Sequence, residues 1–139
     1  EQNPSHYLDL TGPNKIKGIS TSGFGGRSFT KGIASAAVAF SYKNELSDVA
    51  ATLIGNHTIT SDAPVEKKLA EELYSETDII GQEVVVSIGK LDDDVKKRAL
   101  INGLKKAKKL IKNDLIIGAA VFVEDQFGVL PNDYIKAFQ

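Results

Sequence analysis

Two short apolar runs on either side of one long amphipathic segment limit the fold of this chain more than any other feature. Residues 83–89 include three consecutive valines and are typical of a buried strand. Residues 93–112 follow an acidic start and repeat apolar side chains at helical spacing, which predicts a helix. Residues 115–123 form a second apolar run and predict a second strand. We therefore expect a β-α-β unit whose two strands are parallel and either adjacent or separated by one strand.

The rest of the chain is consistent with one α+β or α/β domain. The chain has 139 residues, of which 42% are hydrophobic and 25% charged, and these values are close to the averages of folded domains. Disordered and low-complexity classes are therefore excluded. Residues 1–14 contain two prolines and no usable period, so we expect a flexible or extended arm. Residues 15–139 then form the single domain.

Weaker patterns predict the remaining elements. Residues 15–20 alternate polar and apolar side chains and indicate a strand, whereas residues 45–54 have helical spacing. We also expect a helix over 64–74, which a proline opens, and a short final helix over 132–138. Residues 33–40 leave two alternatives open. Their alanines favour a helix capped by Ser28, and a strand that pairs with 15–20 is the alternative.

The residue inventory removes several kinds of chemistry. The chain has no cysteine, which excludes disulfides, thiolate zinc sites, iron–sulfur clusters and a cysteine nucleophile. Its two histidines, His6 and His57, have no second ligand at helical or hairpin spacing. No serine lies in a Gly-x-Ser-x-Gly elbow. We therefore predict no catalytic residues, no metal and no cofactor.

A glycine-rich stretch provides the first candidate site. Residues 23–26 contain three glycines, and such loops can direct backbone N–H groups at a phosphate when a helix follows. The spacing matches neither the P-loop nor the dinucleotide fingerprint, so a simple turn competes with this interpretation. The candidate anion-binding residues are Gly25, Gly26, Arg27 and Ser28.

The helix expected over 93–112 provides the second candidate. Its apolar stripe consists of Leu100, Leu104, Ala107 and Ile111. We expect the opposite face to be cationic and uninterrupted by acids, which would suit phosphate, lipid headgroups or acidic polymers. Lysines near a helix C-terminus also have a purely structural explanation in the helix dipole. The candidate cationic residues are Arg98, Lys105, Lys108, Lys109 and Lys112.

The function predicted from these patterns is a non-enzymatic interaction or assembly domain that acts through a protein partner or self-association. A small ligand-binding protein or enzyme using the glycine loop, and a binder of anionic polymers or membranes using the lysine helix, are the two alternatives. The net charge of −1 argues against a general nucleic-acid binder. The chain begins at Glu1 and has no methionine, so we expect a processed or excised chain and favour an exported, periplasmic or cell-surface location. We expect no transmembrane segment, because the longest apolar run is too short to cross a bilayer.

Overall fold

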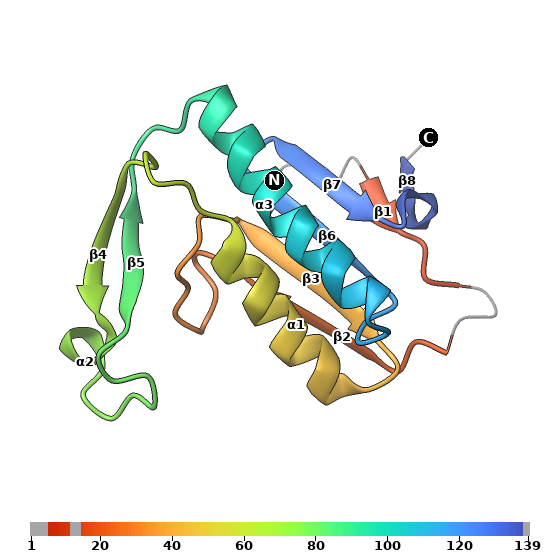
Figure 1. Cartoon of the computed structure of the whole chain (residues 1–139), viewed down its shortest axis with the longest axis horizontal. Helices are drawn as coiled ribbons and strands as arrows, with labels where there is room; N and C mark the ends of the chain where they lie inside the picture. The colour runs from red at the N-terminus through yellow and green to blue at the C-terminus, as the bar shows by residue number, and fades with distance from the viewer. Residues whose placement is uncertain (1–5, 12–14, 138–139) are drawn as a thin grey trace.

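A four-stranded antiparallel sheet forms the centre of the molecule. The computed structural model describes residues 6–11 and 15–137, and α1 and α3 lie side by side on one face of this sheet (Figure 1). The strand order is β2-β3-β6-β7, and every neighbouring pair is antiparallel. The elements are β2 (Gly18–Ser22), β3 (Ala36–Ser41), α1 (Asn44–His57), α3 (Asp93–Lys112), β6 (Gly118–Val123) and β7 (Gln126–Leu130). The chain is therefore a mixed α+β domain, as predicted.

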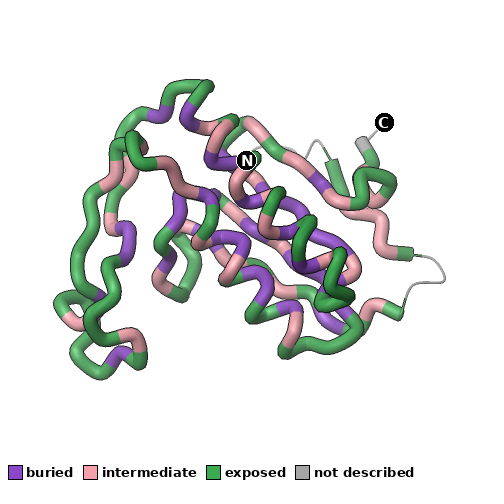
Figure 2. Tube along the Cα trace, in the orientation of Figure 1, coloured by how far each residue is buried: buried purple, intermediate pink, exposed green. Residues whose placement is uncertain are grey.

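The main core lies between the sheet and its two helices. Small side chains such as Ala37, Ala39 and Ala119 cover the helix-facing side of the central strands and are fully buried. Short side chains there allow the helices to pack close to the sheet. The buried residues concentrate between these two layers (Figure 2). No helix among the described residues is long and apolar enough to cross a membrane.

A two-stranded ribbon lies to one side of this core (Figure 1). It consists of β4 (Val65–Leu69), α2 (Ala70–Leu73) and β5 (Glu83–Ile88), with β4 and β5 antiparallel. Most of β4 is exposed, but Val84 and Val85 of β5 are buried. The backbone N–H of Val85 donates to the carbonyl oxygen of Thr30 at 2.8 Å, which connects the ribbon to the central domain.

The first and last strands of the described chain pair with each other on the other side of the molecule (Figure 1). β1 (His6–Leu8) pairs antiparallel with β8 (Ile135–Ala137), which follows the 3-10 helix η1 (Asn132–Tyr134). The ring of Tyr134 packs edge-on against that of Phe40, with centroids 5.0 Å apart. Phe40 is fully buried on the face of the sheet away from the helices, so this terminal segment helps to cover that face. The arm and domain boundaries over 1–14 and 15–139 stay predictions, since residues 1–5 and 12–14 lie outside the described part.

The order strand, helix, strand over residues 83–123 is confirmed, but the parallel arrangement is wrong. β5 pairs with β4 in the ribbon, whereas β6 pairs with β3 and β7 in the central sheet. The two strands therefore do not share a sheet. Val84 and Val85 of β5 are buried where the ribbon meets the residues near Thr30, so their apolar character reflects this contact and not a central strand.

The structure settles one open alternative and corrects two predicted helices. Residues 36–41 are strand β3, which pairs with β2, so the strand alternative holds for this segment. The helix expected over 64–74 is wrong for 65–69, which forms β4, and only 70–73 is helical. The helix expected over 132–138 is a 3-10 turn followed by a strand, with residue 138 outside the described range. In each case pairing with a distant strand overrides the local spacing.

Candidate functional site

One hollow lies between the glycine loop and the far end of the ribbon. It has a volume of about 680 Å³. Arg27, Ser28 and Phe29 line it from the loop, and Tyr74 and residues 76–80 line it from the ribbon. The hollow therefore combines cationic, aromatic and acidic side chains, because Glu76 and Asp78 also lie on its wall.

The structure places the glycine-loop candidates in two groups. Arg27 and Ser28 line the hollow, whereas Gly25 and Gly26 are not among its lining residues. Gly25 has φ +87°, a conformation that favours glycine and that explains this residue as part of a turn. The helix expected after Ser28 is absent, since residues 29–35 contain no regular element. The anion site therefore loses the helix N-terminus on which the prediction depended.

Hydrogen bonds hold the floor of this hollow. The Asn56 Oδ1 atom accepts from the backbone N–H of Lys31 at 2.9 Å and from the Thr30 hydroxyl at 3.4 Å. The Lys31 ammonium donates to the side-chain oxygen of Gln82 across the hollow. These contacts join α1, the loop and the ribbon, so the hollow is a defined junction between three parts of the chain.

A second hollow lies between the C-terminal end of α1 and α3. It has a volume of about 650 Å³, and Lys105, Lys106 and Lys109 line it from α3. His57 and Asn102 complete part of the wall. We call this hollow the lysine groove. The candidates Lys108 and Lys112 are exposed but are not among its lining residues.

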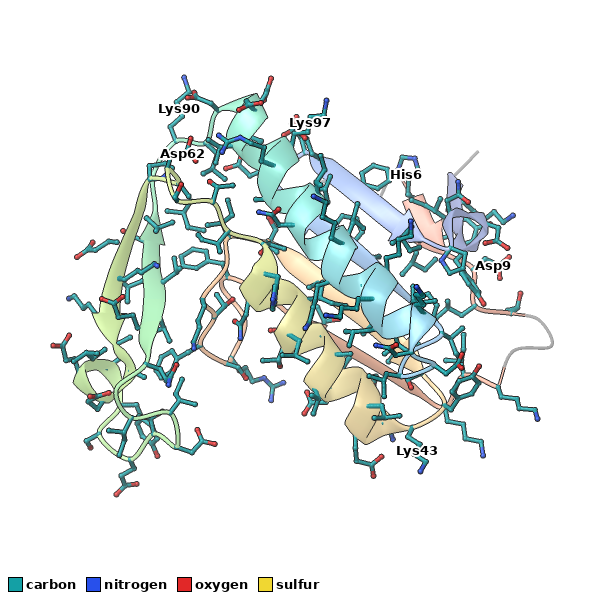
Figure 3. All side chains as sticks on the ribbon, in the orientation of Figure 1. His6, Asp9, Lys43, Asp62, Lys90 and Lys97 are labelled. Atoms are coloured by element: carbon teal, nitrogen blue, oxygen red, sulfur yellow. The ribbon has the colours of Figure 1, made fainter. Side chains whose placement is uncertain are left out.

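The remaining cationic candidate, Arg98, is paired with acids. Its Nη2 atom lies 2.7 Å from Asp62 Oδ2, its Nη1 atom 3.0 Å from Asp62 Oδ1, and its Nε atom 2.9 Å from Asp94 Oδ2. Asp62 precedes the ribbon and reaches α3 near its N-terminal end (Figure 3). The hydrogen bonds from Arg98 hold the pKa of Asp62 well below its usual value. The expectation of a face without acids is therefore wrong at Arg98.

We expect Asp62→Asn to lower the melting temperature near neutral pH. We also expect the melting temperature of this variant to decrease less between neutral and acid pH than that of the wild type. Because the pKa of Asp62 is depressed in the folded chain, its carboxylate stabilises the fold above the ordinary value of 3.8. This contribution is lost as the pH falls through the folded pKa, and it is small because the pair is exposed. Melting curves from about pH 7 to about pH 2.5 measure it. Asp48→Asn, at an exposed carboxylate on α1, is the control, and equal curves for both variants would contradict the prediction.

The histidines lie on different surfaces. The ring of His6 packs against Phe127 with centroids 5.2 Å apart, while His57 lies at the end of α1. The Nδ1 atom of His57 is 2.7 Å from the carbonyl oxygen of Leu53, so Nδ1 carries the hydrogen. Within residues 6–11 and 15–137, no group of three or more histidine, aspartate or glutamate side chains could hold a metal ion.

Sequence reasoning did not identify His57 or Asn102 as partners of the lysines. Lys106 lies at the border of the cationic face by helical spacing, and that spacing was its only signal. His57 and Asn102 come from different helices that meet only when α1 packs beside α3. A local pattern in a single sequence does not indicate a contact between residues of two different helices.

The fold and these hollows define a two-layer α+β domain with a lateral β-ribbon and two polar surface hollows. Residues 1–129 match the model of a bacterial family described as AbpE bacteria, and the chain belongs to this family. No curated protein and no solved structure gives a significant match to the chain.

Proposed function

We propose that this chain is a non-enzymatic interaction domain that contacts a partner protein through the end of its β-ribbon. One observation carries the proposal: large apolar side chains gather there in solvent. Leu73 is 43% exposed, Tyr74 55% and Ile80 69%. Clustered apolar exposure of this kind is typical of surfaces that another protein covers.

Charge around these side chains indicates the chemistry of the partner. Exposed acidic residues surround the apolar group, namely Glu72, Glu76 and Asp78. An apolar centre with a charged rim is the usual anatomy of a protein interface. A partner with an apolar patch and a basic rim would therefore be complementary in both respects.

Internal hydrogen bonds favour binding by holding this loop in one shape. The backbone N–H of Gly81 donates to Glu71 Oε2 at 3.0 Å, and that of Ile79 donates to the Thr77 hydroxyl at 3.3 Å. The backbone N–H of Ala70 donates to the carbonyl oxygen of Gln82 at 2.9 Å. A loop ordered before binding loses less conformational entropy when the partner arrives.

We expect Ile80→Lys to abolish capture of the partner while leaving the fold intact. Immobilised wild-type chain and variant are compared for proteins retained from a bacterial extract, and any retained protein is then purified and titrated. The charged side chain would have to be buried without a counter-ion, so we expect binding to weaken at least about tenfold. Light scattering of the chain alone reports self-association.

The control is Val49→Lys, because Val49 is an aliphatic side chain of α1, outside the ribbon, and is 59% exposed. It should retain the same partner as the wild type. Equal retention by wild type, Ile80→Lys and a Leu73→Lys variant would contradict the proposal. An extracytoplasmic location remains a separate prediction from the sequence, and cell fractionation with an antibody against the chain would test it.

A further inference from the structure

The lysine groove combines concavity with positive charge. Three ammonium side chains, from Lys105, Lys106 and Lys109, line one hollow of about 650 Å³ beside the end of α1. A neighbouring hollow of about 550 Å³ shares Lys105, Asn102 and Ile59 with it. Asn56 and His57 line the groove from α1, and Asn102 lines it from α3 together with the three lysines.

No carboxylate balances this charge. Residues 101–112 contain five lysines and no acidic residue, and neither hollow has an aspartate or glutamate among its described lining. The ion pairs of α3 within the described chain involve only Lys96 and Arg98, near its start. The helix dipole favours cations in the last turn, but Lys105 and Lys106 lie well before it. The helix dipole therefore does not explain the positions of Lys105 and Lys106.

The side chains of the groove other than its lysines are held in place by contacts within the fold. The Asn102 Nδ2 atom donates to the carbonyl oxygen of Ile59 at 2.8 Å. The Asn56 Oδ1 atom already accepts from Lys31, so the group that Asn56 has left to offer is its amide N–H donor. His57 is fixed to the Leu53 carbonyl through Nδ1. The wall is thus positioned by the fold, and its available side-chain charge is cationic.

We propose that the lysine groove binds clustered phosphoryl groups, with their oxygens lying among the ammonium groups of Lys105, Lys106 and Lys109. Lysine ammonium groups bind phosphate as point charges and do not require the bidentate geometry of arginine. No phenylalanine, tyrosine or tryptophan is among the described residues that line the groove, so the usual stacking platforms of nucleic-acid binders are missing there and nucleic acid is disfavoured. The same chemistry occurs in a free polyphosphate and in the headgroups of an anionic lipid surface.

The test uses inorganic tripolyphosphate and the whole chain in a calorimetric titration. We expect Lys105→Gln with Lys109→Gln to weaken binding on the order of tenfold, because each removes a charge in direct reach of the anion. The matched control is Lys108→Gln with Lys112→Gln, which removes the same charge from the same helix outside the groove lining. At about 0.15 M salt, screening over roughly 8 Å should limit the control to a smaller loss.

A second arm distinguishes the two sources of phosphate. Vesicles of phosphatidylglycerol are compared with vesicles of phosphatidylcholine in a sedimentation assay. Both this assay and the titration use four chains: the wild type, the two double lysine variants and Ile80→Lys. Binding to tripolyphosphate alone assigns the groove to a free ligand, and binding to phosphatidylglycerol alone assigns it to a lipid surface. Ile80→Lys should bind both probes as the wild type does, so the result is independent of the ribbon.

Two outcomes overturn the proposal. The first is no binding of either probe by the wild-type chain. The second is an equal loss in both double variants, which would mean diffuse attraction to the helix and not a site. Circular dichroism melting of each variant confirms that the fold is retained, and since all four lysines are exposed we expect it to be.

Discussion

Gly32→Ala should lower the melting temperature by about 10 °C or prevent folding. A Cβ atom at Gly32 would overlap the carbonyl oxygen of Gly55 and would lie 2.5 Å from the Thr58 hydroxyl oxygen. Gly32 is buried, and both neighbours belong to the end of α1, so neither can move without disturbing the helix. Overpacking of this kind costs about 3 kcal/mol, which corresponds to roughly 10 °C in a chain of this length. A thermal melt followed by circular dichroism measures it.

Gly55→Ala is the matched control, because Gly55 lies across the same contact. A Cβ atom there would meet its nearest neighbour, the Ser22 hydroxyl oxygen, at 3.6 Å, which is ordinary contact. Alanine also favours the helix over glycine by up to about 1 kcal/mol. We therefore expect Gly55→Ala to be neutral or stabilising. A similar loss in both variants would show that the contact is not the reason for glycine at position 32.

The two long helices could be predicted because their information is local. The spacing of apolar side chains along 45–54 and 93–112 depends only on the helical repeat, and both segments lie in helices α1 and α3. The acidic start of α3 and its lysine-rich end also agree with the helix dipole. A helix closes its hydrogen bonds within one segment, so neighbours in the sequence are sufficient to identify it.

The strands could not be predicted in the same way, because each depends on a partner far along the chain. Most of β4 is exposed and has no clear apolar face, yet β4 pairs with β5. The alanines of β3 fit a helix by propensity, but Ala37 and Ala39 lie in the core under α1, where short side chains allow the helix to pack close to the sheet. The prediction that β5 and β6 are parallel strands of one sheet was wrong for the same reason. An apolar run indicates that a strand is buried, but it does not identify the strand or helix against which that strand packs.

The candidate sites also differ in whether they depend on local spacing or on residues far apart in the sequence. The cationic face of α3 follows from helical spacing, and the structure places Lys105 and Lys109 in the groove. Arg98 is removed from that set by Asp62, which lies 36 positions earlier in the sequence. The exposure of Ile80 at the ribbon end depends on the pairing of β4 with β5 and could not be read from residues 74–82 alone.

The second large effect is expected at Thr58, where α1 meets both the loop and α3. Thr58 is fully buried, and its hydroxyl donates to the Gly55 carbonyl oxygen at 2.6 Å and accepts from the Ala34 N–H at 2.9 Å. Thr58→Val keeps the shape but removes both hydrogen bonds and leaves the buried Ala34 N–H without an acceptor. We expect a loss of about 2 to 3 kcal/mol of unfolding free energy in urea melts.

The methyl group of Thr58 has a separate role that a double-mutant cycle can isolate. A Cβ atom at Gly103 of α3 would lie 2.6 Å from Thr58 Cγ2, so Gly103→Ala alone should destabilise the chain despite its better helix propensity. Thr58→Ser keeps the hydroxyl, removes that methyl group and leaves a small void, at a cost of about 1 kcal/mol. In the double variant the methyl group that Gly103→Ala introduces occupies this void, and its next neighbour, Val121 Cγ1, lies 3.4 Å away. The double variant should therefore be more stable than Gly103→Ala, with a coupling energy of at least about 1 kcal/mol. If the losses in unfolding free energy of the two single variants simply add in the double variant, this contact does not determine how closely α3 approaches α1.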